Sequence, residues 1–353
     1  MPQVLASQYF VATDGNDKNN GSINAPFQHI QRAADKMDAG DTTFIRGGRY
    51  FEQVNLNKLK GTEEKPYIFK AYNNEKVTLD GSVALKNTWK KYKGNIYQTK
   101  LKQPIWQLFV NDKSMTAARW PNGNWYDGSV WNKKESMMWP DKKRGKLGTY
   151  FNKELAALNF DLTGGIAIVN SGSFKTYQTK ITKHKAGSDK FSYRTKGVKA
   201  HFSHKGRVNH HGYFLEGKLG LLDEENEWFF DPDTLQLYLW AEGGVNPESL
   251  EVRGKVQSYA VNIKRSKDIQ LKGINFFATT FNVSDSQYVK IEDADLLYPS
   301  YSKRMLGDTS SIDVTKMLVG KETDLAKNHL LNCKIAYTDG PAIEMNGKGN
   351  VVE

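Results

Sequence analysis

The sequence predicts an all-β chain whose main body is a parallel β-helix. The first observation is a repeat, because the apolar positions between residues 259 and 298 recur at a constant offset of 20. The second is that short β-rich runs follow one another with turns, and without helices, between them. Stacked coils of three short strands require such a period, since each coil buries its inner face only against its neighbours. Six pairs keep the offset: Val261 and Phe281, Ile263 and Val283, Ile269 and Val289, Leu271 and Ile291, Ile274 and Ala294, and Phe276 and Leu296.

A third copy of this pattern follows at an offset of 59 from the first. Two coils account for about 40 of these residues. The polar stretch 301–321 supplies the remainder, and we expect it to be a loop. The matching residues are Leu330, Cys333 and Ile335, which correspond to Leu271, Ile274 and Phe276.

The N-terminal part predicts a strand, a turn and a capping helix. Residues 9–11 are a β-rich run, and residues 14–24 are rich in turn formers. Pro26 then opens an amphipathic segment that Gly40 ends, so we expect a helix over 26–39 that covers the first coil. Short strands are expected after it, at 43–45, 54–56, 67–69 and 77–79.

Residues 83–250 do not keep the period and predict an inserted β-rich subdomain. Within it, the alternating run 235–240 follows Asp231-Pro232-Asp233, which indicates a β-hairpin. The chain then divides into 1–82 (cap and first coils), 83–250 (insertion) and 251–353 (further coils). Residues 342–345 and 351–353 resemble the middle of another coil with no cap after it. We therefore expect a C-terminally truncated β-helix, with further coils and some catalytic groups beyond Glu353.

The composition favours a polyanionic partner. The chain has 50 Lys and Arg against 39 Asp and Glu, a formal net charge of +11, and such a surplus attracts sulfate-, carboxylate- or phosphate-bearing polymers. Nucleic acid is one of these, but no recognisable nucleic-acid-binding motif is present. No run approaches the roughly 18 apolar residues of a membrane span. The first ten residues lack the pattern of a signal peptide, and the single cysteine, Cys333, fits either redox compartment.

Several segments together carry a resemblance to a known group of proteins. They are YFVATDGND at 9–17, Pro26-Phe27, GDTTFIRGGRY at 40–50, and the stretches 109–111 with 118–121 and 227–231 with 237–238. The opening resembles that of bacterial right-handed β-helix enzymes of the pectate-lyase-like group, and the later stretches are similar to those of its hydrolase-type members. The resemblance implies a right-handed coil and a polysaccharide-active protein, either glycoside hydrolase or polysaccharide lyase. It specifies the scaffold better than the reaction.

The repeat also predicts which polar side chains line the outer face of the coils. Asn275, Asp295 and Lys334 fall in one column, and Tyr298 and Tyr337 fall in another a few residues on. In the family that the sequence resembles, substrate lies along this outer face. We therefore expect Lys334, Tyr298 and Tyr337 to bind substrate.

Asp295, Asp339 and Glu344 are the candidate catalytic residues. Asp339 falls at a strand end, and Glu344 stands between the apolar Ile343 and Met345, so it should face outward into the same groove. Glycoside hydrolysis uses two carboxyl groups roughly 5 to 10 Å apart, one as acid and one as base or nucleophile. Coils stack about 4.8 Å apart, so carboxylates one or two coils apart meet this need. The alternative is that they are solvated turn and ladder residues.

A lyase needs different groups, namely cations that neutralise a uronate, a base and an acid. The stretch 201–211 holds four of the seven histidines. From it we assign Arg207, His210 and His211 to substrate binding, with Tyr213 nearby. The alternative is a basic strand edge or loop in the insertion. No carboxylate stands at a ligand spacing from these histidines, so a metal site is not expected.

Five tryptophans lie within residues 106–139. Tryptophans stack on sugar rings, but an inserted subdomain also needs a core. Both roles stay open, and we assign Trp120 to substrate binding.

These patterns favour a secreted or periplasmic glycoside hydrolase that acts on an acidic, sulfated or uronate-containing polysaccharide. A polysaccharide lyase of the same fold and a non-catalytic polysaccharide-binding β-helix are the alternatives. We expect a monomer that binds neither nucleic acid nor a membrane and needs no cofactor. A structural calcium ion at Asp14, Asn16 and Asp17 is a weaker alternative, since the run lacks the full ligand set of a calcium loop and indicates a turn.

Overall fold

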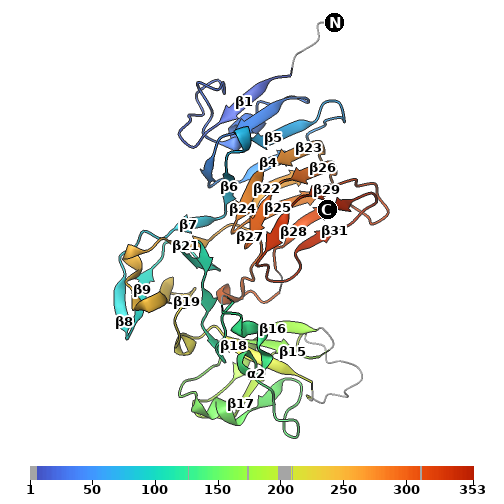
Figure 1. Cartoon of the computed structure of the whole chain (residues 1–353). Helices are drawn as coiled ribbons and strands as arrows, with labels where there is room; N and C mark the ends of the chain where they lie inside the picture. The colour runs from blue at the N-terminus through green and yellow to red at the C-terminus, as the bar shows by residue number, and fades with distance from the viewer. Residues whose placement is uncertain (1–5, 126, 173–174, 198–207, 209, 311) are drawn as a thin grey trace. The chain divides into compact units, whose positions relative to one another are not determined.

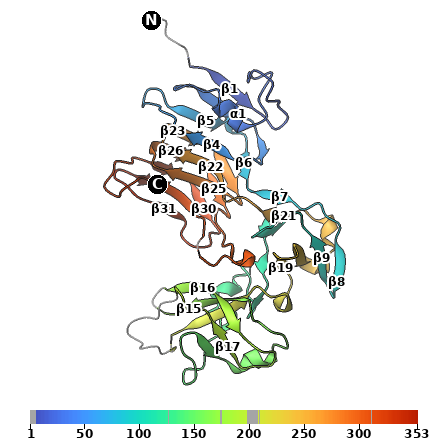
Figure 2. The same cartoon turned by 180° about the vertical axis from the view of Figure 1, so that it is seen from behind.

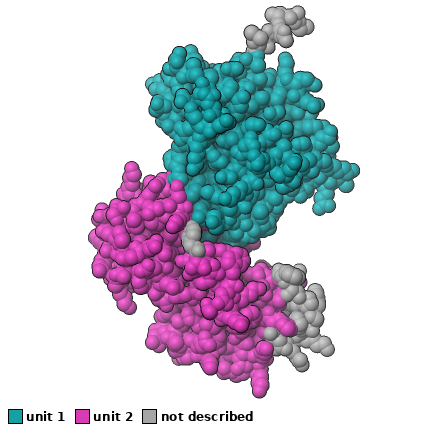
Figure 3. Space-filling model, in the orientation of Figure 1, with its two compact units in different colours: residues 1–83, 255–301, 312–353 teal, residues 84–254, 302–311 magenta. Residues whose placement is uncertain are grey.

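The computed structural model describes residues 6–125, 127–172, 175–197, 208, 210–310 and 312–353. The chain divides into two compact units. Unit 1 comprises residues 1–83, 255–301 and 312–353, and unit 2 comprises residues 84–254 and 302–311 (Figure 3). Among the described residues, no helix is long and apolar enough to cross a lipid bilayer.

Unit 1 is a parallel β-helix, whose described strands form three sheets (Figures 1 and 2). From β2 onward, a strand of sheet 1 is followed along the chain by one of sheet 2 and one of sheet 3 before the next coil begins, with the main segment of unit 2 inserted between β6 and β22. Sheet 1 contains β1 (Gln8–Val11), β2 (Thr42–Ile45), β5 (Tyr67–Ala71), β23 (Lys267–Lys272), β26 (Gln287–Glu292), β29 (His329–Leu331) and β32 (Val351–Val352). Sheet 2 contains β3 (Gly48–Tyr50), β6 (Val77–Asp80), β24 (Ile274–Phe277), β27 (Asp295–Leu297) and β30 (Lys334–Ala336). Sheet 3 contains β4 (Val54–Asn57), β22 (Tyr259–Lys264), β25 (Thr280–Ser284), β28 (Thr315–Leu318) and β31 (Ile343–Met345).

The register of these sheets confirms the 20-residue repeat. Val261 of β22 pairs in parallel with Phe281 of β25, and Leu271 of β23 pairs with Ile291 of β26. All four side chains are buried in the core of unit 1. Each coil therefore covers the apolar face of the next, and the burial of this surface is what holds the stack together.

The corners of the coils repeat as well. The backbone turns there through left-handed conformations, which cost a residue with a side chain roughly 1 to 2 kcal/mol. The ladders on either side hold these residues in place. Such corner residues are Arg265 and Asp285 between sheets 3 and 1, Gly273, Asp293 and Asn332 between sheets 1 and 2, and Ala278, Tyr298 and Tyr337 between sheets 2 and 3.

The chain leaves the coils at the corner between sheets 2 and 3. After β24 this corner contains only Ala278 and Thr279, whereas after β6 the chain enters unit 2 and returns for β22. The segment 302–311, which follows β27, also belongs to unit 2. The buried Lys255 stabilises this corner, since its Nζ donates hydrogen bonds to the carbonyl oxygens of Tyr298 (2.9 Å) and Pro299 (3.0 Å).

The N-terminal helix is shorter than the sequence predicts. Helix α1 (Ile30–Ala34) replaces the expected 26–39, because Phe27 instead pairs with Val11 beside β1 and fills the core. Carboxylates from other segments accept hydrogen bonds from the backbone N–H groups at the start of α1. Glu52 accepts from Ile30 at 2.8 Å, and Asp17 accepts from Gln28 and His29 at 3.0 Å. The run suggested as a turn or calcium loop thus caps the helix start.

The expected loop over 301–321 is also wrong in part. Strand β28 lies inside it and completes sheet 3 of its coil, paired with β25. A short 3₁₀ helix, η8 (Arg304–Leu306), lies in the segment that belongs to unit 2. The sequence did not predict this strand because only one of its faces is buried. Its outward positions, such as Lys316, are polar and made the stretch resemble a loop.

Unit 2 is built mainly from antiparallel strands. Its hairpin of β19 (Glu227–Asp231) and β20 (Gln236–Trp240) confirms the hairpin predicted at 235–240. One sheet contains these two strands with β8 (Lys90–Lys93), β9 (Ile96–Lys100) and β12 (Thr116–Ala117). Another contains β13 (Arg119–Trp120), β14 (Thr149–Phe151), β15 (Ile166–Asn170), β16 (Thr176–Lys183), β17 (Lys190–Tyr193) and β18 (Gly212–Glu216). A four-stranded sheet joins β7 (Ser82–Ala84), β10 (Leu108–Val110), β11 (Lys113–Ser114) and β21 (Val252–Lys255).

Among the described residues, the helical elements other than α1 and η8 are also short. They are α2 (Lys133–Ser136), η1 (Tyr72–Asn74), η2 (Ser129–Trp131), η3 (Lys153–Ala157), η5 (Leu219–Leu221), η6 (Glu242–Gly244) and η7 (Pro247–Ser249).

Candidate functional site

The outer face of sheet 2 carries a polar column. Lys334 pairs with Asp295 in neighbouring strands, and the backbone N–H of Asp295 donates to Asn275 Oδ1 at 2.9 Å. Asp295 and Lys334 are exposed, while their neighbours Leu296 and Ile335 pack into the core. The predicted column is therefore confirmed, and it places a cation beside a carboxylate on an open surface.

The column extends into coils that precede unit 2 in the chain. Asn275 pairs with Thr78, and Thr78 pairs with Arg49. Arg49 Nη1 lies 3.2 Å from the buried carboxylate of Asp80, and the guanidinium stands 4.9 Å from the centre of the Phe277 ring. The sequence analysis missed Arg49 because the 20-residue offset is interrupted between β6 and β22. An extension of the coil pattern across the insertion would have found it.

The predicted tyrosine column is also confirmed. The rings of Tyr298 and Tyr337 stack with centroids 4.9 Å apart and an interplanar angle of 20°. Phe277 meets Tyr298 edge to face at 5.8 Å. Tyr298 is only 6% exposed, whereas Tyr337 is 55% exposed. The ring of Tyr337 thus covers the ring of Tyr298, which occupies the same corner one coil earlier.

Asp339 lies at the corner between sheets 2 and 3, after β30. Its backbone N–H donates to Ser300 Oγ of the preceding coil at 3.2 Å. Asp339 is half-buried, and Tyr337 stands two residues before it. Asp295 and Asp339 thus belong to neighbouring coils on the sheet 2 side of unit 1.

The structure places Glu344 on a different sheet. It lies in β31 of sheet 3, paired in register with Lys316, and the two charged groups are 3.7 Å apart. Its neighbours Ile343 and Met345 pack against the core, so its predicted outward orientation is confirmed. The single groove expected to hold three carboxylates is not formed, because the strand of Glu344 belongs to another sheet. A catalytic role for Glu344 stays a prediction.

A shallow hollow of 510 Å³ covers the sheet 2 column near its corner with sheet 1. Asp293 lies in this hollow, where Asn332 Nδ2 donates to its Oδ1 at 2.7 Å and Lys272 lies 3.4 Å away. The hydrogen bond from Asn332 and the charge of Lys272 lower the pKa of Asp293. Its carboxylate is therefore ionised at neutral pH. The lining residues are Asn275, Asp293, Ala294, Asp295, Asn332, Cys333, Lys334 and Glu353.

The basic stretch 201–211 is described only in part. Arg207 lies outside the described residues. His210 is exposed, but His211 is 1% exposed, and its Nδ1 lies 2.6 Å from Tyr150 Oη among the buried rings of unit 2. The structure therefore places His211 in the core of unit 2 and away from its surface, because its ring fills space beside Tyr150.

The tryptophans of residues 106–139 fall into two classes. Trp106 is buried, and Trp120 of β13 is half-buried against the core of unit 2. Trp125, Trp131 and Trp139 are 50%, 73% and 48% exposed. Both predicted roles, core and surface, are thus represented.

Residues 9–203 match the family model described as Pel9A-like, right handed beta helix region. This chain belongs to the Pel9A-like right-handed β-helix family. The match confirms the resemblance and the handedness expected from the sequence. Among the described residues of this Pel9A-like chain, no three His, Cys, Asp or Glu side chains are grouped so as to hold a metal ion.

Two curated relatives match shorter stretches. The chain is 44% identical over 81 residues to pectate lyase PEL9 of Emericella nidulans, which covers 23% of this chain and 20% of that protein. It is 39% identical over 72 residues to the uncharacterized protein YwoF of Bacillus subtilis, covering 20% of this chain and 15% of YwoF. The alignments span a fifth or less of either relative.

The fold resembles that of a solved structure named Glycoside hydrolase, with a TM-score of 0.65 and 15% sequence identity. The superposition covers 82% of this chain and 62% of that one. At this level of identity the likeness supports the architecture of the Pel9A-like chain and carries no statement about its chemistry.

Proposed function

We propose that this Pel9A-like chain hydrolyses glycosidic bonds in an acidic polysaccharide on the outer face of sheet 2. The observation that carries the proposal is that two neighbouring coils carry Asp295 and Lys334 at the start of their sheet 2 strands and Tyr337 and Asp339 at the corner that follows. In this proposal the exposed ring of Tyr337 stacks on a sugar, and Lys334 binds its sulfate or carboxylate group. Asp295 and Asp339 supply the two carboxyl groups of the reaction. One protonates the leaving oxygen while the other acts as base or nucleophile.

The charge of the chain supports an acidic substrate. A formal net charge of +11 raises the local concentration of a polyanion around the protein. The same attraction is screened by salt, so binding of the polymer should weaken as ionic strength rises. We propose further that the protein acts outside the cytoplasm as a monomer, since its substrate is an extracellular polymer.

Elimination is the second candidate reaction. A relative that shares 44% identity over 81 residues bears the name pectate lyase, and the sheet 2 column holds the cations Arg49 and Lys334. Elimination from a uronate needs a cation against the carboxylate and a base for the proton beside it. In this reaction Lys334 would be the cation against the carboxylate, and Tyr337 would be the base.

The test mixes the purified protein with sulfated, uronate-containing and neutral polysaccharides, and follows reducing ends together with the ultraviolet absorbance of unsaturated uronates. New reducing ends without that absorbance are the expected result. The absorbance itself would establish elimination. Saturable binding of the polymer without either product would establish a binding module and overturn the catalytic proposal.

Variants locate the site within unit 1. Asp295→Asn and Asp339→Asn should each lower turnover by about 100-fold or more, with an unchanged circular dichroism spectrum. The matched control is Asp285→Asn, which removes an exposed carboxylate from the corner between sheets 3 and 1 and should have a much smaller effect. If both aspartate variants keep normal turnover, the site lies elsewhere.

A further inference from the structure

Unit 2 exposes two large aromatic side chains at one place. The indole rings of Trp125 and Trp131 have centroids 5.4 Å apart and an interplanar angle of 80°. Their exposed fractions of 50% and 73% are high for a residue that buries most of its surface in an ordinary fold. The two rings form the walls of an open corner, and each presents an apolar face to the surroundings.

The segment that carries these rings is held firmly. Ser129 Oγ accepts the backbone N–H of Asn124 at 2.7 Å, and the backbone N–H of Ser129 donates to Asp127 Oδ1 at 2.7 Å. The buried Ser136 donates from its Oγ to the carbonyl oxygen of Val130 at 3.0 Å. These hydrogen bonds fix the backbone at Asn124 and Val130, next to the two rings, and so lower the cost of ordering when a ligand binds.

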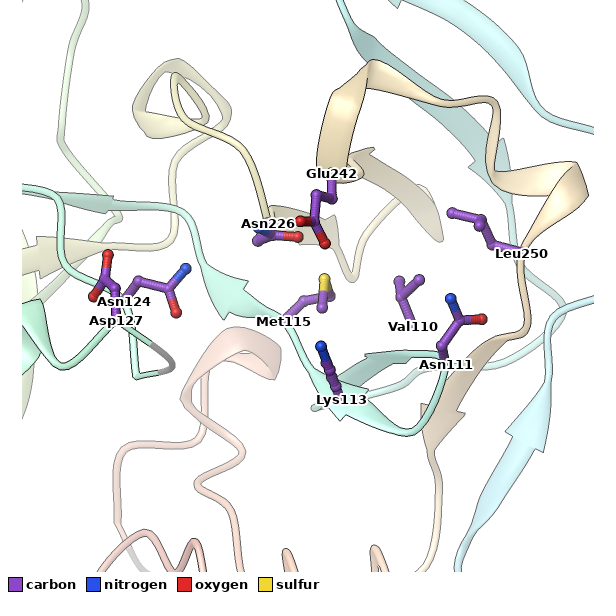
Figure 4. A pocket seen from close by; sticks show the side chains of 9 residues that line it. All are labelled: Val110, Asn111, Lys113, Met115, Asn124, Asp127, Asn226, Glu242 and Leu250. Carbon is purple, nitrogen blue, oxygen red and sulfur yellow. The ribbon is translucent and has the colours of Figure 1, made fainter.

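A pocket of 570 Å³ adjoins the same segment, since Asn124 and Asp127 line it (Figure 4). This volume lies within the range of sites for small organic ligands, about 300 to 1,000 Å³. Its walls combine three apolar side chains with six polar ones, and Figure 4 shows polar groups on both sides of it. The lining residues are Val110, Asn111, Lys113, Met115, Asn124, Asp127, Asn226, Glu242 and Leu250.

The chemistry of this lining fits an uncharged sugar. Carboxylates and amide groups bind hydroxyl groups through hydrogen bonds, and the C–H face of a pyranose packs on an indole ring. The carboxylates Asp127 and Glu242 face one cation, Lys113, so the pocket would repel a sulfate or a uronate. This composition is opposite to the surplus of cations in the whole chain.

We infer that Trp125, Trp131 and the adjoining pocket form a binding site for neutral pyranose units of a polysaccharide. The inference goes beyond the proposed reaction, and rests on it only in taking a polysaccharide as the partner. The site lies in unit 2, so it is distinct from the sheet 2 column and its carboxylates. Its role is to bind a chain that carries neutral sugars and to raise the local concentration of that chain.

The test uses isothermal titration calorimetry with the full chain and neutral hexasaccharides as probes: cellohexaose, xylohexaose and β-1,4-galactohexaose. We expect saturable binding of at least one of them. Trp125→Ala and Trp131→Ala should each weaken that binding by about tenfold or more, because each removes one stacking face. Glu242→Gln should weaken it less, since the amide retains an acceptor.

Trp139→Ala is the matched control, because Trp139 is 48% exposed and outside the pair. It should leave the affinity unchanged. Thermal unfolding of each variant verifies that the fold persists. The inference is overturned if no neutral probe binds, if both variants of the pair bind as the parent does, or if a charged hexasaccharide binds this site as tightly. Calorimetry follows no turnover, so it can use Asp295→Asn protein, and a failure here is distinct from a failure of the cleavage assay.

Discussion

The two units of this protein bury their residues in different ways. Unit 1 repeats one coil, and the space between its three sheets is filled by apolar side chains that pair at a constant spacing. Both units bury some charged groups, such as Asp80 and Lys255 in unit 1 and Glu227 and Glu216 in unit 2. In unit 2 these groups lie in a core that has no such period. A periodic core follows from burial alone. A core without a period depends on individual polar contacts, each of which has to be satisfied.

The largest effect that we expect comes from the periodic core. Phe276 is 1% exposed and contacts the coils on both sides of its own. Phe276→Ala should lower the free energy of unfolding by about 3 to 5 kcal/mol, from lost burial and a cavity. The control is Asn282→Ala, on the outer face of the same coil, which should change it by less than about 0.5 kcal/mol. Chemical denaturation followed by circular dichroism measures both, and equal effects would mean that the stack is not what stabilises unit 1.

Removal of a buried ion-pair partner in unit 2 should give the next largest change in the free energy of unfolding. Arg304 Nη2 lies 3.2 Å from Glu216 Oε1, and the side chains are 12% and 6% exposed. Arg304→Met leaves a buried carboxylate without its partner. It should lower the free energy of unfolding by about 3 kcal/mol or more. The double variant with Glu216→Met should recover most of that loss.

The comparison pair lies on the surface of unit 1. Lys316 and Glu344 are 3.7 Å apart and are both solvent-exposed in part. Lys316→Met should lower the free energy of unfolding by less than about 1 kcal/mol, because water and salt screen such a pair. A double-mutant cycle on each pair, followed by thermal unfolding, would refute the contrast between the units if the two coupling energies were equal.

Glu227 predicts one contribution to the pH dependence of stability. Burial raises the pKa of Glu227 to about 9, against the hydrogen bonds from the backbone N–H groups of Arg119 and Asp223. The folded chain then binds a proton that the unfolded chain has released, so the contribution of Glu227 to stability is fully present below about pH 4.5 and is lost as the pH rises toward 9. The slope should reach at most about 1.4 kcal/mol per pH unit.

Glu227→Gln should remove this slope, because the amide does not titrate. Urea denaturation at pH 5, 7 and 9 compares the variant with the parent chain. Parallel curves for the two proteins would show that Glu227 is already ionised in the folded state.

The smallest effect concerns the corners of the coils. Arg265 is exposed and has a φ of 53°, a conformation that glycine adopts without strain. Arg265→Gly should raise the free energy of unfolding by up to about 1 kcal/mol. Asn282→Gly, in an extended strand, should lower it by about 0.5 to 1 kcal/mol. Effects of the same sign would mean that the ladders do not impose the left-handed corners.

Much of unit 1 could be predicted from the sequence because its side chains obey a period. The spacing that relates Val261 to Phe281 also relates Asp295 to Lys334 once the intervening residues are allowed for. One period therefore predicted both the core and the outer column. The period contains no information on how many residues a corner adds. For that reason strand β28 was hidden in an expected loop, and Glu344, which faces outward as predicted, was expected in one groove with Asp295 although its strand belongs to sheet 3.

Other features had no periodic signal. Arg49 belongs to the Asp295 column, but the chain of unit 2 separates them in sequence. The Arg304 and Glu216 pair joins segments that no spacing relates, and burial of His211 depends on rings gathered from several strands. Contacts of this kind are set by tertiary packing, which a single sequence does not display as a pattern.

The corner between sheets 2 and 3 is the position in this fold that accepts inserted residues. A coil is positioned by its ladders above and below, so residues added at the corner leave the register of both neighbours as it was. That is how the same turn is two residues long after β24 and contains most of unit 2 after β6. The corner also carries Tyr337 and Asp339. Residues added there lie outside the buried core of unit 1, so the length and sequence of this corner can vary while the interior of the coils remains unchanged.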